Sequence, residues 1–500
     1  MLAGPLAAPV APIATAAALR QGRAMANAPS VALLRDLAER LGPRGFTRDA
    51  AEMAPWLTDW RGQWHGRAAA LVSPVETAQV QAIVARCAAE GVPVVPQGGN
   101  SSMVGGATPD EGGSALLLSL RRMKAIRSLS PDDNALVAEA GAILADVHAA
   151  AEGIGRRFPL TLGAKGSATV GGLVSTNAGG TQVLRFGPMR SLVLGLEAVL
   201  PDGSVFEGLS ALRKDNRGYD LKHLLIGAEG TLGVVTAASL RLVPAAGSRA
   251  VAWVGLDSPV AALALLRRLE ARLGDSVESF ELVPEVALSL VLHHIPQARA
   301  PLAEAHRWNV LIEAVAPQGA PEAGPPLEAA LAAAIEAGLA ADATLAASER
   351  QAEALWRLRD SISEAERHAG AAAKHDISVP VSAMPRFVET VAASVERHFP
   401  GTKVIAFGHL GDGNVHFNVG APPEADGAAW LEAEAPAVSA FVYGEVAAAG
   451  GSISAEHGIG QMKRGALAAT ISPVRLAAQR AIKQALDPAG IMNPGKLLPD

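Results

Sequence analysis

Three of the twelve histidines lie in two glycine-rich stretches of the last hundred residues, together with a glutamate. The stretch 408–418 (GHLGDGNVHFN) is typical of a strand, a tight turn and a second strand, and the turn can bring His409 and His416 toward one point. The stretch 454–460 (SAEHGIG) adds Glu456 and His457. Two imidazoles and a carboxylate can form an open Zn²⁺ site that leaves positions for substrate and water. Each histidine can equally be a hydrogen-bonded structural residue, so the pattern alone leaves both interpretations open.

A second charged group precedes these stretches. In 356–367 (WRLRDSISEAER), Arg359 and Ser363 are four residues apart, so they are expected to share one face of a helix. Lys374 opens the predicted strand 374–380 (KHDISVP). Arginine, aspartate and glutamate are dense in this helix. Taken by itself it is therefore expected to be a solvated amphipathic helix with ordinary ion pairs.

Three glycine-rich clusters lie within one block of the chain: 96–106 (PQGGNSSMVGG), 162–180 (LGAKGSATVGGLVSTNAGG) and 227–233 (GAEGTLG). Glycine permits positive φ and lets backbone N–H groups approach an anion closely. One such cluster would indicate tight turns, but three together favour a phosphate-bearing cofactor. The sequence contains neither G-x-G-x-x-G after a strand nor G-x-x-x-x-G-K-[ST], which disfavours a Rossmann domain and a P-loop.

These clusters resemble FAD enzymes of the vanillyl-alcohol oxidase/PCMH type. The stretches 96–106 and 162–180 are similar to the two flavin loops of that superfamily. The stretch 213–222 (RKDNRGYDLK), followed by 227–233, resembles its D-2-hydroxyglutarate dehydrogenase branch. The likeness extends from about residue 55 to residue 498. Many covalent members carry a histidine in the first loop, where this chain has Asn100 and no histidine, so the resemblance implies non-covalent FAD.

The resemblance also implies which residues hold FAD. They belong to the three clusters, to the residues that follow the third, and to the C-terminal tail: Pro96, Gly98, Gly99, Asn100, Ser101, Ser102, Met103, Gly163, Gly166, Ser167, Thr169, Gly172, Thr176, Asn177, Gly179, Gly180, Glu229, Gly230, Gly233, Val235 and Asn493.

The same likeness assigns His409, His416 and Glu456 to Zn²⁺, and Asn418 and His457 to substrate contacts. In this assignment His457 is the catalytic general base.

Arg359, Ser363 and Lys374 match positions that bind substrate carboxylates in the family. Ser363 departs from the family pattern, which has threonine there. The hydroxyl is kept and a methyl group is lost, so we expect the role to survive with looser binding.

Several elements must position these residues. Residues 80–89 are expected to form a helix and 92–95 the start of a strand, and 251–256 and 309–315 are strand-like. The expected fold class is α+β. It comprises an N-terminal tail and helix (1–45), a PCMH-type FAD-binding domain (46–246), an α+β substrate domain with an antiparallel sheet covered on one face by helices (247–400), and a C-terminal segment carrying the metal and catalytic residues together with helices (401–500).

The composition is that of a globular protein and excludes several classes. The chain has 500 residues, 49% of them hydrophobic, which is enough for several domains. With 43 basic and 49 acidic side chains, the net charge of −6 leaves no basic surplus for nucleic acid. The single cysteine, Cys87, excludes an intrachain disulfide, an iron–sulfur cluster and a cysteine-rich zinc module.

The first nineteen residues carry no charge, but prolines interrupt them, so we expect neither a transmembrane segment nor a signal peptide. Arg20, Arg23 and the absence of acids before Asp36 could instead indicate a transit peptide, whereas the simpler interpretation is a disordered tail upstream of a start at Met25. The Ala/Arg/Gly bias is typical of a GC-rich bacterial coding sequence. It favours the cytoplasm over the mitochondrial matrix.

The resemblance implies an FAD- and zinc-dependent dehydrogenase that oxidises D-2-hydroxyglutarate, or a related D-2-hydroxy dicarboxylic acid, by hydride transfer to flavin N5. A D-lactate or glycolate dehydrogenase is the main alternative, and Lys374 discriminates because a monocarboxylate gives its ammonium nothing to bind. A zinc hydrolase with structural glycine loops and a catalytically silent flavin-binding subunit fit less well. An electron-transfer flavoprotein, a quinone, a cytochrome or a keto acid could accept the electrons, and a homodimer is the family-level expectation.

Overall fold

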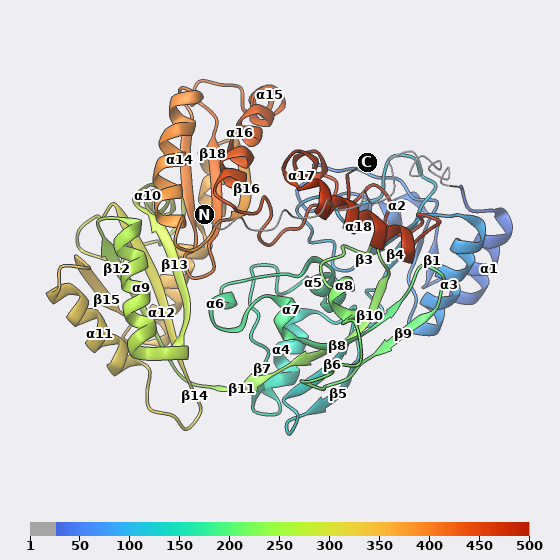
Figure 1. Ribbon diagram of the computed structural model, residues 1–500, viewed down its shortest axis with the longest axis horizontal. Helices are drawn as coiled ribbons and strands as arrows, with labels where there is room; N and C mark the ends of the chain where they lie inside the picture. The colour runs from blue at the N-terminus through green and yellow to red at the C-terminus, as the bar shows by residue number, and fades with distance from the viewer. Residues whose placement is uncertain (1–26, 500) are drawn as a thin grey trace, which may run out of the picture.

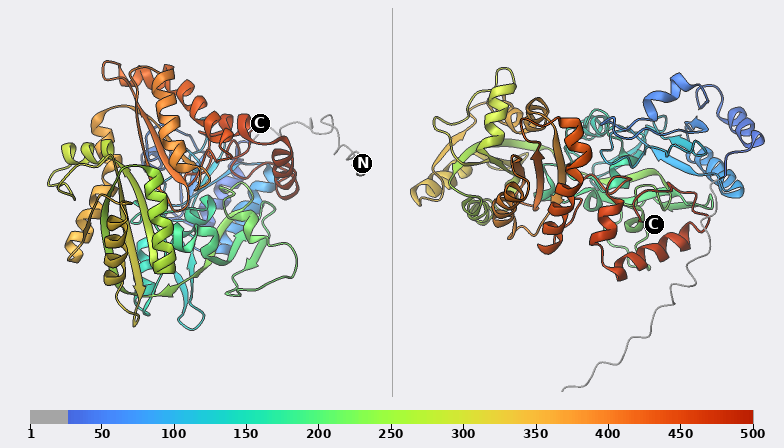
Figure 2. Two further views of the ribbon diagram at one scale, coloured as in Figure 1. Left: turned by 60° about the vertical axis from the view of Figure 1, so that its left-hand side comes forward. Right: turned by 90° about the horizontal axis from the view of Figure 1, so that it is seen from above.

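Two lobes lie side by side in the computed structural model, which describes residues 27–499 (Figures 1 and 2). The first part of the chain forms one lobe and residues 246–448 form most of the other, and the last helix and the C-terminal tail return to the first lobe. The predicted N-terminal tail falls mostly outside the described residues, as does the question of a transit peptide. Helices accompany largely antiparallel sheets, which confirms the predicted α+β class.

The N-terminal lobe begins with a four-stranded sheet in the order β1-β2-β4-β3. Its strands are β1 (Phe46–Thr47), β2 (Ala70–Val72), β3 (Val94–Gln97) and β4 (Leu116–Ser119). Helices α1 (Val31–Leu41) and α3 (Thr77–Glu90) pack on it. The predicted helix at 80–89 lies within α3, whose buried side chains recur at helical spacing. The helix ends at Glu90 and is capped by Gly91, which has the left-handed φ of 69° common at helix C-termini.

A five-stranded antiparallel sheet in the order β5-β6-β10-β8-β9 completes the lobe. Its strands are β5 (Ile126–Ser130), β6 (Ala135–Glu139), β8 (Val193–Val199), β9 (Val205–Gly208) and β10 (Val234–Arg241), and β7 (Arg156–Arg157) pairs separately with β11 (Val243–Pro244). The accompanying short elements are α2 (Ala50–Met53), η1 (Ala54–Trp56), α4 (Leu144–Glu152), α5 (Val170–Thr176), α6 (Val183–Phe186), α7 (Met189–Leu192) and α8 (Lys222–Leu225). The first glycine cluster begins at the end of β3, the second contains α5, and the third directly precedes β10.

The second lobe is built on a seven-stranded antiparallel sheet in the order β15-β12-β14-β13-β17-β18-β16. Its strands are β12 (Ala246–Leu256), β13 (Val277–Pro284), β14 (Trp308–Pro317), β15 (Asp342–Leu345), β16 (Ala372–Ser378), β17 (Lys403–His409) and β18 (Asn414–Gly420). The predicted strands at 251–256 and 309–315 lie in β12 and β14. Because β17 and β18 pair with β13 and β16, the sheet crosses the domain boundary expected at residue 400.

Helices cover both faces of this sheet, which corrects the expectation of one covered face. On one side lie α9 (Pro259–Leu273), α11 (Gly324–Glu336), α14 (Met384–His398) and α16 (Ala435–Ala448). On the other lie α10 (Glu285–His294), α12 (Glu349–Asp360) and α13 (Ile362–Ala369). The reason is visible in β12, where Ala252 and Val254 enter the first core while Val251 and Trp253 enter the second.

The rest of the chain links the lobes. Helices α15 (Gly427–Ala433) and α17 (Arg464–Thr470) both pack beside α16, whereas α18 (Pro473–Leu486) lies over the N-terminal lobe (Figure 1). After α18, Met492 forms a parallel bridge with Val94 of β3. The structure therefore divides the expected segment 401–500 between the two lobes. Within residues 27–499, no helix has the length and apolar character needed to cross a bilayer.

Candidate active site

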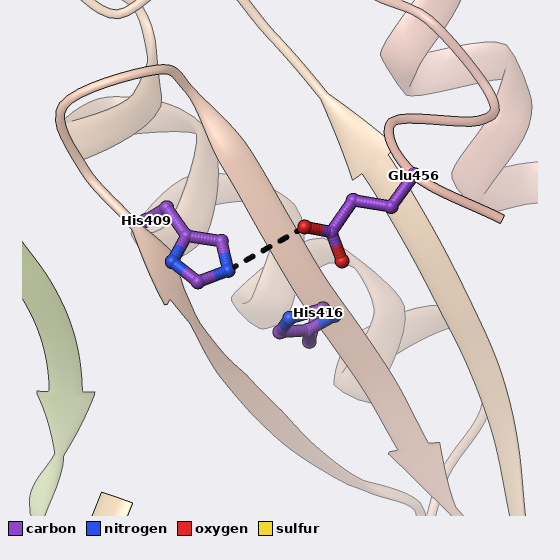
Figure 3. A group of neighbouring side chains, drawn as sticks. All are labelled: His409, His416 and Glu456. Atoms are coloured by element: carbon purple, nitrogen blue, oxygen red, sulfur yellow. Dashed lines mark ion pairs between the residues drawn. The ribbon is translucent and has the colours of Figure 1, made fainter. Parts of the chain in front are cut away.

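His409 and His416 lie on adjacent strands of the second lobe, with Glu456 opposite them on a loop. His409 ends β17 and His416 lies on β18, and their ring centres are 5.7 Å apart. The Nε2 atom of His409 is 3.8 Å from Oε1 of Glu456. Figure 3 shows Glu456 reaching toward His409, with His416 beside them. One ligand atom from each of the three lies within 4.8 Å of the others, so the group can hold a metal ion.

The turn between β17 and β18 has the predicted strand–turn–strand form. Asp412 accepts the backbone N–H of Asn414 through Oδ1 at 2.9 Å, which is a local turn contact. Gly413 has φ of 80°, and a Cβ there would lie 2.1 Å from the carbonyl oxygen of Val379. Glycine is therefore required for this turn to close against the chain beyond β16. The closed turn keeps the two histidines on one face of the sheet.

A glutamate that sequence analysis missed supports His409. Glu281 lies on β13, directly across from His409, and is fully buried. Its Oε1 is 2.6 Å from Nδ1 of His409, and its Oε2 accepts a hydrogen bond from Nε of Arg359 at 2.8 Å. The signal in the sequence was a pair of acids, Glu278 and Glu281, in the largely apolar strand β13, all of whose residues are buried. Such acids must be paired when both faces of a strand are buried.

The loop that carries Glu456 and His457 is held from both lobes by buried carboxylates. Asp376 of β16 accepts the backbone N–H groups of Glu456 and His457 through Oδ2, each at 2.9 Å. The same oxygen is 3.6 Å from Nδ1 of His457. From the other lobe, Glu229 accepts the N–H groups of residues 459 and 460, each at 2.7 Å. Sequence analysis missed Asp376, which contacts this loop across about eighty residues of chain.

Burial and neighbouring charges set the protonation of these groups. Burial lowers the pKa of His416 to about 3, with the charges of Arg359 and His409 acting in the same direction. Burial also lowers the pKa of His457, against the opposing charge of Asp376. Both imidazoles are therefore neutral near pH 7, as a ligand and a proton acceptor must be.

His409 and the acids behave differently. Burial lowers the pKa of His409, but the carboxylate of Glu281 outweighs it and raises the pKa to about 9. Burial opposes ionisation of Glu281, yet the charges of His409 and Arg359 lower its pKa to about 2. Burial raises the pKa of Glu456. A divalent cation bound at this group would displace the proton from Nε2 of His409 and keep Glu456 ionised.

The structure separates two of the predicted carboxylate-binding residues, Arg359 and Ser363. Helix α12 ends at Asp360 and α13 begins at Ile362, so the single helix expected for 356–367 is broken at residue 361. Arg359 is buried against Glu281, whereas Ser363 is exposed. The expectation that the two share one helix face is thus wrong, because the helix is interrupted between them.

Lys374 and Asn418 are direct neighbours across β16 and β18. Both contact the buried Glu366, another acid that sequence analysis missed. Asn418 donates through Nδ2 to the two carboxylate oxygens at 2.9 and 2.8 Å, and Lys374 Nζ lies 3.4 Å from Oε2. The Lys374 side chain keeps 28% of its surface exposed, so its ammonium can accept a further anionic partner.

The glycine clusters of the N-terminal lobe converge on one another. A Cβ on Gly98 would lie 2.2 Å from Oγ1 of Thr169, and one on Gly230 would lie 3.1 Å from the Pro96 side chain. The first cluster therefore packs directly against the second and the third. A Cβ on Gly179, in the second cluster, would lie 3.1 Å from Oε1 of Glu456. The convergent loops thus adjoin the His/Glu group.

The backbone of these loops is unusual at several predicted FAD contacts. Among residues 27–499, seven non-glycine residues have positive φ, and four of them belong to the predicted set: Asn100, Asn177, Glu229 and Asn493. Asn493 donates through Nδ2 to the carbonyl oxygens of Gly106 and Glu229 at 2.9 and 2.7 Å, which ties the C-terminal tail to the first and third clusters. Such strained positions gather at ligand clamps.

The residues present fit a large polar cofactor. Three buried acceptor atoms beside the loops have no hydrogen-bond partner among the described residues: Gln97 Oε1, Thr169 Oγ1 and Asn493 Oδ1. Buried polar groups are normally satisfied, so a ligand with its own donors suits this place. Two predicted contacts use their side chains elsewhere. Glu229 holds the loop at 459–460, and Thr176 donates to the carbonyl oxygen of Gly172 at 3.0 Å.

Two family models match successive parts of the chain. Residues 68–208 match a family model described as an FAD binding domain, and residues 246–497 match one described as the C-terminal domain of FAD linked oxidases. A Bos taurus protein named D-2-hydroxyglutarate dehydrogenase, mitochondrial, is 40% identical over 464 residues, covering 92% of this chain and 82% of that protein. A Xanthomonas citri protein named D-2-hydroxyglutarate dehydrogenase is 38% identical over 450 residues, covering 90% and 93%.

A solved structure titled p-cresol methylhydroxylase with substrate bound has a TM-score of 0.70 to this chain at 14% identity. The match covers 94% of this chain and 96% of that one. At this level of identity, the likeness shows a shared fold and nothing further.

Proposed function

This chain belongs to the D-2-hydroxyglutarate dehydrogenase family of FAD-linked enzymes, and we propose that it oxidises D-2-hydroxyglutarate, or a close dicarboxylic relative, to the 2-oxo acid with Zn²⁺ as a second cofactor. One observation carries the proposal. A metal-competent group, His409, His416 and Glu456, adjoins the neutral His457 beside loops that fit FAD.

The convergent glycine loops and the C-terminal tail would hold FAD, with Thr169 and Asn493 offering unsatisfied buried acceptors. Bound FAD supplies the hydride acceptor, flavin N5, for the hydrogen at C2 of the substrate. The absence of a histidine in the first loop supports a non-covalent attachment. Cys87 cannot replace it, because its thiol is buried in the core between α3 and the first sheet.

His409, His416 and Glu456 would hold the metal ion. A bound Zn²⁺ polarises the 2-hydroxyl and lowers its pKa. Nitrogen and carboxylate ligands suit Zn²⁺, and three protein ligands leave coordination positions open, as in catalytic zinc sites.

Side chains of this protein would accept the proton and bind the substrate carboxylates. His457 takes the proton of the 2-hydroxyl, since its imidazole is neutral and its loop is held in place by Asp376 and Glu229. Arg359 and Asn418 bind and orient carboxylate oxygens, with the hydroxyl of Ser363 in a lesser role because it is exposed. Lys374 faces the distal carboxylate, which a monocarboxylic acid lacks.

A panel of D- and L-2-hydroxy acids, with an artificial dye as electron acceptor, tests the proposal. We expect turnover with D-2-hydroxyglutarate to exceed turnover with D-lactate and with glycolate, and its L-enantiomer to be inactive. A preference for D-lactate would instead support the monocarboxylate alternative. A colourless protein without flavin absorbance would support the zinc hydrolase. An electron-transfer flavoprotein as natural acceptor, a homodimer and a cytoplasmic location stay predictions.

A further inference from the structure

Glu281 lies between His409 of the metal-competent group and Arg359, the arginine proposed to bind the substrate carboxylate. It lies in β13, the strand next to β17, and has no exposed surface. Each carboxylate oxygen has a different partner: Oε1 contacts Nδ1 of His409 at 2.6 Å, and Oε2 contacts Nε of Arg359 at 2.8 Å. A buried carboxylate is retained only where its partners compensate the cost of removing it from water.

The first contact sets the tautomer of His409. A carboxylate only accepts hydrogen bonds, so Nδ1 must carry the hydrogen. In the neutral ring the lone pair then lies on Nε2, the atom that faces Glu456 at 3.8 Å. Histidines that bind metals generally donate their other N–H to a carboxylate or carbonyl, which orients the ring and raises its basicity.

The second contact orients Arg359. Its guanidinium also stacks on the Phe407 ring, with Cζ 5.1 Å from the ring centre. Only Nε is hydrogen-bonded to a residue within 27–499, so the two terminal nitrogens remain for another acceptor. A planar guanidinium fixed in this way presents a fork suited to a carboxylate.

We propose that Glu281 is a positioning residue that holds His409 in the metal-binding tautomer and, with its other oxygen, aims Arg359 at the substrate carboxylate. This inference rests on the proposed function. One buried side chain would then determine where the metal ion and the substrate lie relative to each other. No other described acid contacts both groups directly.

Glu281→Gln removes this function with little change in shape. The amide offers one acceptor oxygen and one NH₂ group, whose two N–H bonds only donate. The amide oxygen can accept the hydrogen bond from Nε of Arg359 while the NH₂ group faces Nδ1 of His409. The reverse orientation would place the NH₂ group against the N–H of Arg359, donor against donor. The NH₂ group then donates to Nδ1, so the hydrogen of His409 moves to Nε2 and blocks the metal-binding lone pair. We therefore expect zinc affinity to fall about 10–100-fold.

The test measures zinc affinity of the metal-stripped full-length protein by competition with a chromophoric chelator. The matched control is Glu278→Gln, in the same strand and equally buried. Glu278 pairs with Arg157 and Arg185 of the other lobe at 2.6 and 2.8 Å, away from the His/Glu group. The control is expected to lower the melting temperature and to bind zinc as tightly as wild type. Glu281→Asp keeps the charge and is expected to bind zinc more tightly than Glu281→Gln.

Equal zinc affinities for wild type and Glu281→Gln would overturn the inference and leave the proposed function standing. Wild-type protein that binds no zinc would overturn both, and the wild-type measurement alone reveals it. If Glu281→Gln does not fold, Glu281→Asp and Glu278→Asp form the comparison. Weaker zinc binding in the first variant only is then the supporting result, and equal affinities again contradict the inference.

Discussion

Replacing Lys374 by methionine should lower kcat/KM for D-2-hydroxyglutarate much more than for D-lactate. The ammonium lies 3.4 Å from Glu366 and keeps 28% of its side-chain surface exposed, so it can reach a second carboxylate. A charge-assisted contact of this kind contributes about 1.5–3 kcal/mol, which corresponds to about 10–150-fold in kcat/KM. Because Glu366 already neutralises part of the Lys374 charge, we expect a loss near the lower limit.

The assay is steady-state turnover of both acids with a dye acceptor, on wild type and three variants. Glu366→Gln removes the competing negative charge while keeping a group that can accept from Asn418, so it should lower KM for the dicarboxylate. The double variant Lys374→Met/Glu366→Gln completes the cycle and isolates the coupling between the two residues. Equal losses on the two acids for Lys374→Met would refute the reasoning, because a folding or metal defect lowers both alike.

Four further predictions concern the cofactors, the base and stability. Acid precipitation should release all flavin into the supernatant, since neither the first loop nor the buried Cys87 can attach it, and a washed pellet that stays yellow would contradict this. Prolonged chelation should abolish turnover, with recovery on adding Zn²⁺, while the flavin absorbance persists; activity that survives removal of all metal would be the contrary result. His457→Ala should slow anaerobic flavin reduction about 10²–10⁴-fold, and an unchanged single-turnover rate would exclude His457 as the base. Burial lowers the pKa of His375 to about 4, so the unfolded chain binds its proton more tightly and the free energy of unfolding should fall by up to about 3 kcal/mol between pH 6.5 and 4. Urea unfolding of wild type and His375→Gln across this range measures the effect, and identical pH slopes would disprove it.

The local patterns of the sequence predicted those parts of the site that short segments determine. The spacing of glycine, aspartate and histidine in 408–418 predicted the hairpin that brings His409 and His416 together, because turn residues and strand alternation act within a few positions. The spacing of apolar residues likewise predicted helix α3, and the three glycine clusters could be recognised directly in the sequence. Resemblance then connected these segments to FAD, which no single motif could do.

The sequence did not reveal the partners that come from distant strands and loops. Glu281 meets His409 across 128 residues, Asp376 meets the His457 loop across 81, and Glu366 meets Asn418 across 52. The acids in β13 signalled only that Glu281 needs a buried partner, and no local pattern in the sequence identified the partner of any of the three acids. The pairing of β13, β17, β18 and β16 buries Glu281 and Asp376 beside their partners, and the packing of α13 on this sheet buries Glu366 beside Asn418.

The sequence by itself predicted a set of candidate residues for the chemistry, because glycine clusters, turn residues and closely spaced histidines leave local patterns in a chain. Tertiary structure alone decided how those residues are held. It placed β17 and β18 in the same sheet as β13, covered that sheet on both faces, and interrupted the helix between Arg359 and Ser363. The physical reason is that strand pairing and burial depend on contacts between segments far apart in the chain, and no local pattern specifies those contacts.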